Sequence, residues 1–183
     1  MTYRSGTYVA FHANKTTEPT ESDIKYYNLL KAWDKSDSFD FKFVNSHDKS
    51  SAVRDSSKKV TLEQVLKERL RNSKNMILVI GKTTKEDRDW VPLEISYAVD
   101  TCEIPIIAAY TGYKYILDPS KLNDLWPSAL KTRINNDSAH IIHIPFREKA
   151  ITCAIAQFTH DNYPKNGGLG WYSEETYSKW GYK

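Results

Sequence analysis

The stretch NMILVIGKTTKEDRDWVPLEISYAV, residues 75–99, decides how this chain is expected to fold. Its first seven residues are almost continuously apolar, which is typical of a strand covered by helices on both faces. A short polar loop follows. A helix is then predicted from Trp90 onward, with Asp89 as its cap and Pro92 in its first turn. A buried strand followed by an amphipathic helix is the repeating unit of a parallel α/β sheet.

The same alternation runs along the whole chain. Strands are predicted at 7–12, 39–45, 75–81, 104–110 and 139–146, and helices at 21–37, 61–72 (capped by Thr61), 90–102, part of 122–134, and 148–162. We therefore expect a flavodoxin-like, doubly wound parallel sheet of five strands in the order 2-1-3-4-5. One domain is expected to span residues 1–183, with an aromatic-rich tail from about residue 163 whose tryptophans cover a sheet edge or serve association.

Composition excludes several classes of protein. Apolar residues make up 40% and charged residues 27% of the 183 residues, and the net charge of +3 is too small to indicate a nucleic-acid partner. No run of about 18 apolar residues suggests a membrane span, and the first residues do not read as a secretory signal. Cys102 and Cys153 lie in apolar surroundings, which favours packing in a reducing compartment. A cytoplasmic protein is expected.

Familiar nucleotide and metal motifs do not fit. VIGKTT resembles a phosphate loop, but Met76 stands where that motif requires a glycine. GGLG in the tail follows no predicted strand, and the ends of the first and third strands lack the acidic residues of a phospho-receiver. His140 and His143 lie three apart on a predicted strand, so they point to opposite faces and cannot share a metal ion. No metal site is expected.

The fold class predicts where a ligand binds. In open parallel sheets the site lies at the carboxyl ends of the strands, beside the switch point between the first and third strands. Here that edge carries the loops after Phe11, Val44 and Ile80. His12 and His47 end adjacent predicted strands, and both are therefore expected within reach of a substrate.

Glu94 is the strongest catalytic candidate. The predicted helix turns one stripe toward the sheet, formed by Val91, Ile95, Ala98, Val99 and Cys102. Trp90 and Glu94 lie one turn apart on the neighbouring stripe, so an aromatic ring and a carboxylate project together off the core stripe. The helix N-terminus favours the ionised carboxylate. This pair suits a sugar ring that develops positive charge. The alternative is that Glu94 is an ordinary solvated helix residue.

Three parts of the chain together resemble a known family. VAFHAN (9–14), LVIGKTTKEDRDWVPLEI (78–95) and the aromatic tail are similar to the TIR-like proteins of bacterial anti-phage systems, of the Thoeris ThsB kind. The sharpest likeness is a third strand ending in Ile-Gly, a polar loop and then W-x-x-x-E. The resemblance implies an enzyme that consumes NAD as a substrate rather than a redox cofactor. It would break the nicotinamide–ribose bond and yield ADP-ribose or a cyclic isomer that activates a downstream effector.

The resemblance also implies roles for individual residues. Glu94 would be the catalytic carboxylate, and Trp90 would line the ribose pocket. Phe11, His12 and Asn14 lie in the first loop, where the family binds substrate. The position that ends the second strand is often acidic in relatives. In this sequence that position is Asn45, with Asp48 close by.

Two other functions are compatible with the sequence. A nucleoside deoxyribosyltransferase-like enzyme would share the fold and the glutamate but act on nucleosides. An inactive TIR-type interaction module would act in signal transduction without cleaving NAD. For the enzyme itself, the resemblance implies low activity as an isolated monomer and activation on self-association or by an infection signal.

Overall fold

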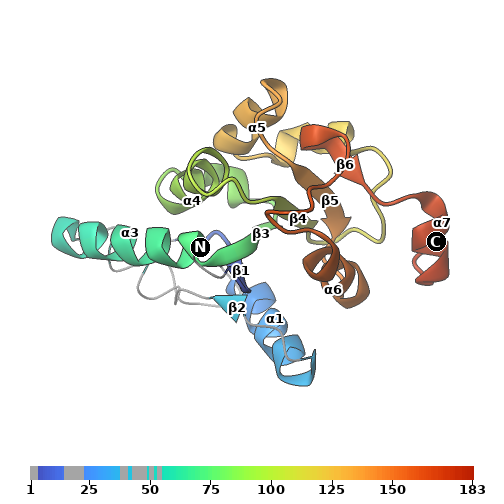
Figure 1. Cartoon of the computed structure of the whole chain (residues 1–183), viewed down its shortest axis with the longest axis horizontal. Helices are drawn as coiled ribbons and strands as arrows, with labels where there is room; N and C mark the ends of the chain where they lie inside the picture. Colours follow the sequence, from blue (N-terminus) through green and yellow to red (C-terminus); the bar gives the residue numbers. More distant parts are fainter. Residues whose placement is uncertain (1–3, 15–22, 38–40, 43–48, 50–51, 53–54) are drawn as a thin grey trace.

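The computed structural model describes residues 4–14, 23–37, 41–42, 49, 52 and 55–183 (Figure 1). Its centre is a parallel sheet in the order β2-β1-β3-β4-β5-β6. The strands are β1 (Gly6–Ala10), β2 (Phe41–Lys42), β3 (Ser73–Ile80), β4 (Ile106–Tyr110), β5 (Ile141–Pro145) and β6 (Gly170–Trp171). The predicted order of the first five strands is confirmed. The sixth strand, formed by the tail, was not predicted.

Helices cover both faces of the sheet, as expected for a doubly wound fold. They are α1 (Ile24–Asp37), α3 (Ser56–Arg71), α4 (Trp90–Asp100), α5 (Ser128–Asn135), α6 (Glu148–Gln157) and α7 (Glu174–Lys179), with short 3-10 helices η1 (Thr84–Glu86), η2 (Pro119–Leu125) and η3 (Gly167–Leu169). One apolar core joins the sheet to α3, α4 and α5, and a second joins its other face to α1 and α6. β3 and β4 are buried between them, which accounts for their continuous apolar sequences.

Neither Thr61 nor Asp89 caps its helix with its side chain, although Asp89 does occupy the predicted N-cap position of α4. Helix α3 begins at Ser56, and Asp55 caps it by accepting hydrogen bonds from the backbone N–H groups of Ser57 and Lys58. Thr61 lies inside that helix, where its hydroxyl donates to the carbonyl of Ser57. The capping pattern at Thr61 gave the wrong helix start because residues 56–60, which precede it, are also helical. The cap of α4 is described with the site below.

The tail is fixed to the sheet by a buried polar cluster. Nε2 of His143 lies 2.8 Å from the carbonyl oxygen of Gly168 in η3, and Nδ1 lies 2.7 Å from the hydroxyl of Tyr110. A carbonyl can only accept, so Nε2 carries the proton and Nδ1 accepts from Tyr110. Trp126 donates to the same hydroxyl. Burial lowers the pKa of His143 to about 4, so the ring is neutral at pH 7.

The second histidine of this segment has a different environment. His140 is exposed and stacks on the ring of Tyr163, with centroids 4.4 Å apart. The two rings have separate partners: Tyr163 for His140, and Tyr110 and Gly168 for His143. In the described part of the chain, no helix combines the length and the apolar character needed to cross a membrane.

Candidate functional site

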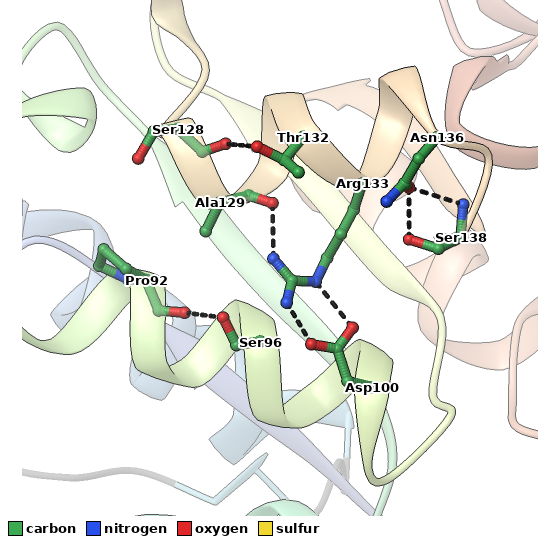
Figure 2. Close-up of polar contacts among 9 residues, drawn as sticks. All are labelled: Pro92, Ser96, Asp100, Ser128, Ala129, Thr132, Arg133, Asn136 and Ser138. Carbon is green, nitrogen blue, oxygen red and sulfur yellow. Dashed lines mark hydrogen bonds and ion pairs between the residues drawn. The ribbon is translucent and has the colours of Figure 1, made fainter.

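Helix α4, which carries Glu94, is anchored at both ends. At its start, Asp87 rather than Asp89 provides the cap, because its Oδ1 lies 2.9 Å from the backbone nitrogens of both Asp89 and Trp90. At its end, Asp100 forms a two-pronged ion pair with Arg133 of α5 (Figure 2). These contacts fix the axial position of the helix, and therefore the height of Glu94 above the sheet.

Glu94 lies in a buried charged cluster. Its Oε1 accepts a 2.6 Å hydrogen bond from the hydroxyl of Tyr8 in β1 and lies 2.8 Å from Nζ of Lys49. The side chains of Glu94 and Lys49 are 0% and 1% exposed. The same ammonium lies 4.6 Å from the ring centroid of Phe11. A carboxylate, an ammonium, a phenol and an aromatic ring therefore meet at the carboxyl end of β1.

The prediction that Glu94 lies off the core is wrong. Trp90 and Tyr97, which lie on the same stripe as Glu94, contact helix α3, which packs against α4. Lys67 and Arg71 of α3 lie over the ring of Tyr97, at 5.5 and 5.4 Å. Glu94 itself is enclosed by Tyr8 of β1 and by Lys49, contacts that a helical wheel of α4 cannot show. The solvated-helix alternative fails for the same reason.

One oxygen of Glu94 has no hydrogen-bond partner. Oε2 is buried and unpaired among the described residues, whereas Oε1 takes both bonds. Burial raises the pKa of Glu94, while the charge and hydrogen bond of Lys49 and the hydroxyl of Tyr8 oppose that rise. Buried polar atoms are nearly always satisfied in native proteins, so an unpaired one calls for an explanation such as a catalytic role, strain, or a bound water or ion. Oε2 is therefore the atom of Glu94 that retains the capacity to accept a hydrogen bond.

Trp90 and Glu94 both hold Lys49, from opposite ends of that residue. The indole nitrogen of Trp90 donates to the carbonyl oxygen of Lys49 at 3.1 Å, and Glu94 pairs with its ammonium. The predicted pairing of Trp90 with Glu94 is thus realised through a third residue. Lys49 was missed because it is one lysine within a polar stretch, with no periodicity that marks it as buried.

The first loop contributes two buried residues next to this cluster. Phe11 packs in the core on the α1 side of the sheet and lies under the Lys49 ammonium. His12 is 7% exposed, and its Nδ1 lies 3.3 Å from the hydroxyl of Thr83. Asn14 is exposed and has a left-handed backbone with φ of 48°. The predicted substrate residues Asn45, His47 and Asp48 lie outside the described residues.

Asp23 was not predicted as a site residue, yet it lies at the switch point, next to Thr84 and Gly81. Its carboxylate accepts from the hydroxyl of Thr84 at 3.2 Å, and burial raises its pKa. A Cβ atom at position 81 would stand 2.7 Å from Asp23 Oδ1, so Gly81 gives this carboxylate its room. The Ile-Gly end of β3 is the signal that could have indicated a close approach there.

No group of three or more potential metal ligands is found among the residues that the structure describes. The model of the family described as Thoeris protein ThsB, TIR-like domain, matches residues 8–115. The matched segment is more than half of the chain and contains β1 from Tyr8 onward, β3, β4 and the whole Glu94 cluster. The chain therefore belongs to the TIR-like domain family of the Thoeris anti-phage protein ThsB.

Proposed function

We propose that this protein cleaves the nicotinamide–ribose bond of NAD, with Glu94 as the catalytic carboxylate. The observation that carries the proposal is the buried, unpaired Oε2 of Glu94. It sits on a rigid helix beside the carboxyl end of β1, where parallel sheets bind ligands. Family membership supports the same reading, because the matched segment includes this cluster.

The reaction needs little from the protein except charge and position. Nicotinamide leaves the positively charged pyridinium as a neutral molecule, so no general acid has to protonate it. The barrier lies in the positive charge that develops on the ribose, as in glycoside hydrolysis. Oε2 of Glu94 accepts a hydrogen bond from a ribose hydroxyl, and the carboxylate stabilises the developing cation. Water then gives ADP-ribose, or a group of the same molecule closes a cyclic isomer.

Lys49 has two effects on this chemistry. Its ammonium keeps Glu94 ionised in a buried site, against the desolvation that raises the carboxyl pKa. It also offsets the negative charge on which the reaction depends. Because Glu94 and Lys49 are both buried, the ribose reaches Oε2 only after Lys49 moves aside. The isolated chain is therefore a low-activity state, and self-association or an infection signal supplies the rearrangement.

The product carries the signal. NAD is consumed as a substrate in the cytoplasm, no resident cofactor takes part, and neither nucleic acid nor membrane is a partner. The released nucleotide activates a separate effector protein. The family match identifies the type of domain, and this proposal adds the reaction that the domain would catalyse.

The test is direct incubation with NAD. The purified chain, dilute and then concentrated until it self-associates, is given NAD, and nicotinamide and nucleotide products are followed by mass spectrometry. Release of nicotinamide that rises with association supports the proposal. Base release from deoxynucleosides instead of NAD would indicate a deoxyribosyltransferase. Oligomers that release no nicotinamide would identify an interaction module.

A further inference from the structure

A cavity at the carboxyl edge of the sheet lies outside the Glu94 cluster. Its volume is about 620 Å³, within the range of sites for small molecules. It is formed by the start of α1 and by the loops that follow β3 and β4. Six of the lining residues carry recognition chemistry: Asp23, Lys25, Tyr26, Lys82, Thr83 and Tyr113.

The charged residues of the cavity match the phosphate part of a nucleotide. Lys25 and Lys82 are both exposed there. Lys25 lies 5.1 Å from the ring centroid of Tyr26, and Lys82 has no anionic partner among the described residues. Two ammonium groups at one rim, one of them uncompensated, favour an anion with more than one charge. The hydroxyl of Thr83 adds a donor at the same position.

The remaining residues match a ribose and a base. Asp23 is a buried carboxylate held by Thr84, in space that Gly81 leaves open. A carboxylate beside a switch point is a common acceptor for ribose hydroxyls. Tyr26 and Tyr113 provide ring faces at the cavity wall, and Tyr113 is 37% exposed. Aromatic faces bind bases by stacking.

A continuous set of contacts joins the cavity to Glu94. Lys49 lies on Glu94 and over Phe11, and the next residue, His12, contacts Thr83 of the cavity wall. A ligand with two nucleotide halves can therefore place one half at each location. We infer that this cavity binds the adenosine diphosphate half of the substrate, while the nicotinamide ribose lies at Glu94. This inference rests on the proposed function for its substrate, but the binding site is tested separately.

Binding is measured first, without any turnover. The full chain is titrated with ADP, with adenosine and with inorganic pyrophosphate by calorimetry. ADP is expected to bind more tightly than either fragment, because phosphate and nucleoside contacts combine. Lys82→Ala should weaken ADP binding by about tenfold, the effect of one charged hydrogen bond. The matched control is Lys85→Ala, an exposed lysine of the same loop that does not line the cavity, and it should bind ADP as the wild type does.

Turnover then tests how the two locations cooperate. For each variant, kcat/KM is compared for NAD and for nicotinamide mononucleotide, which lacks the adenylate half. The ratio of the two values should fall about tenfold in Lys82→Ala and stay at the wild-type value in Lys85→Ala. Equal ADP binding by the wild type and Lys82→Ala would overturn the site even if NAD is cleaved. Cavity-dependent ADP binding without NAD cleavage would uphold the site and overturn the proposed reaction.

Discussion

Among the described residues, the buried polar clusters around His143 and around Glu94 differ in how completely their hydrogen-bonding groups are satisfied. Around His143, each ring nitrogen has one partner, and the hydroxyl of Tyr110 both donates and accepts. Around Glu94, one oxygen takes two bonds while the other has none among the described residues. The first cluster is neutral and the second is ionic. A complete neutral network stabilises structure, whereas an incomplete ionic one keeps a reactive group in a low-dielectric environment.

The two clusters also respond to pH in opposite directions. The pKa of His143 is lowered by burial, so the unfolded chain binds a proton more readily and stability falls as pH drops. The pKa of Glu94 is raised by burial, so the folded chain binds the proton more readily than the unfolded chain does. The contribution of Glu94 to the free energy of unfolding therefore falls as the pH rises. Burial is the largest cause in both cases. The proposed chemistry requires ionised Glu94, and burial makes that charge state the less stable one.

The largest expected effect is on catalysis by Glu94→Gln. The substitution keeps the shape of the side chain but removes the negative charge that stabilises the ribose cation. Nicotinamide release should fall by about 10²–10³-fold. The matched control is Glu63→Gln, which makes the same change in a half-exposed Glu–Lys pair within α3 and should keep wild-type activity. Rates are compared at a temperature where all variants are folded, and equal rates for Glu94→Gln and wild type would refute the catalytic role.

Trp90→Ala tests the wall of the same site. It removes an aromatic surface and the indole that holds the backbone of Lys49. KM for NAD should rise and kcat should fall, because both the pocket and the position of Lys49 change. Steady-state kinetics separate the two terms, and an unchanged KM would place the ribose elsewhere.

A double-mutant cycle of Lys49 and Glu94 measures the ionic cluster itself. Lys49→Met or Glu94→Gln alone leaves one buried group without its partner and should lower the free energy of unfolding by about 3–5 kcal/mol. The double variant removes both charges and should recover most of that loss. Urea denaturation provides the four free energies. Additive losses would mean that the pair is not coupled in solution.

The His143 cluster should show a smaller effect that depends on pH. With its pKa lowered from 6.5 to about 4, His143 should account for a loss of about 2.5 kcal/mol between pH 7 and pH 4.5. The variant His143→Gln can still donate and accept but does not titrate. The measurement is the difference between wild type and variant in unfolding free energy at the two pH values. A difference that does not change with pH would show that the ring is not buried in neutral form.

The smallest effect is expected at the exposed pair of Figure 2. Asp100 is 51% exposed, so solvent screens its ion pair with Arg133. Arg133→Ala should lower the free energy of unfolding by about 1 kcal/mol or less. This value is a reference for the buried Lys49–Glu94 pair, because it measures how much an ion pair contributes to the free energy of unfolding near water. If Arg133→Ala lowered the free energy of unfolding as much as Lys49→Met does, the exposed and buried ion pairs would not differ in strength.

Much of the fold follows from the sequence because apolar periodicity records burial. Met76–Ile80 of β3 and Ile106–Tyr110 of β4 are continuous apolar runs, and the strand order follows from parallel crossovers. β6 was missed because two residues, Gly170 and Trp171, carry no pattern. Glu94 was singled out by residue type and position, but its burial against Tyr8 and Lys49 cannot be read from a pattern within α4. Lys49 and Asp23 reach the site through tertiary packing alone.

The place of β5, between β4 and the short β6, bears on how the protein can be shortened. The family match ends at residue 115, immediately after β4, yet β4 is paired along its whole length with β5. A fragment of residues 8–115 would present the five buried residues of β4 as an open sheet edge, a ready template for pairing between chains. The boundary of recognisable family sequence is therefore not a boundary of folding. Such a fragment should aggregate although it contains every residue of the Glu94 cluster.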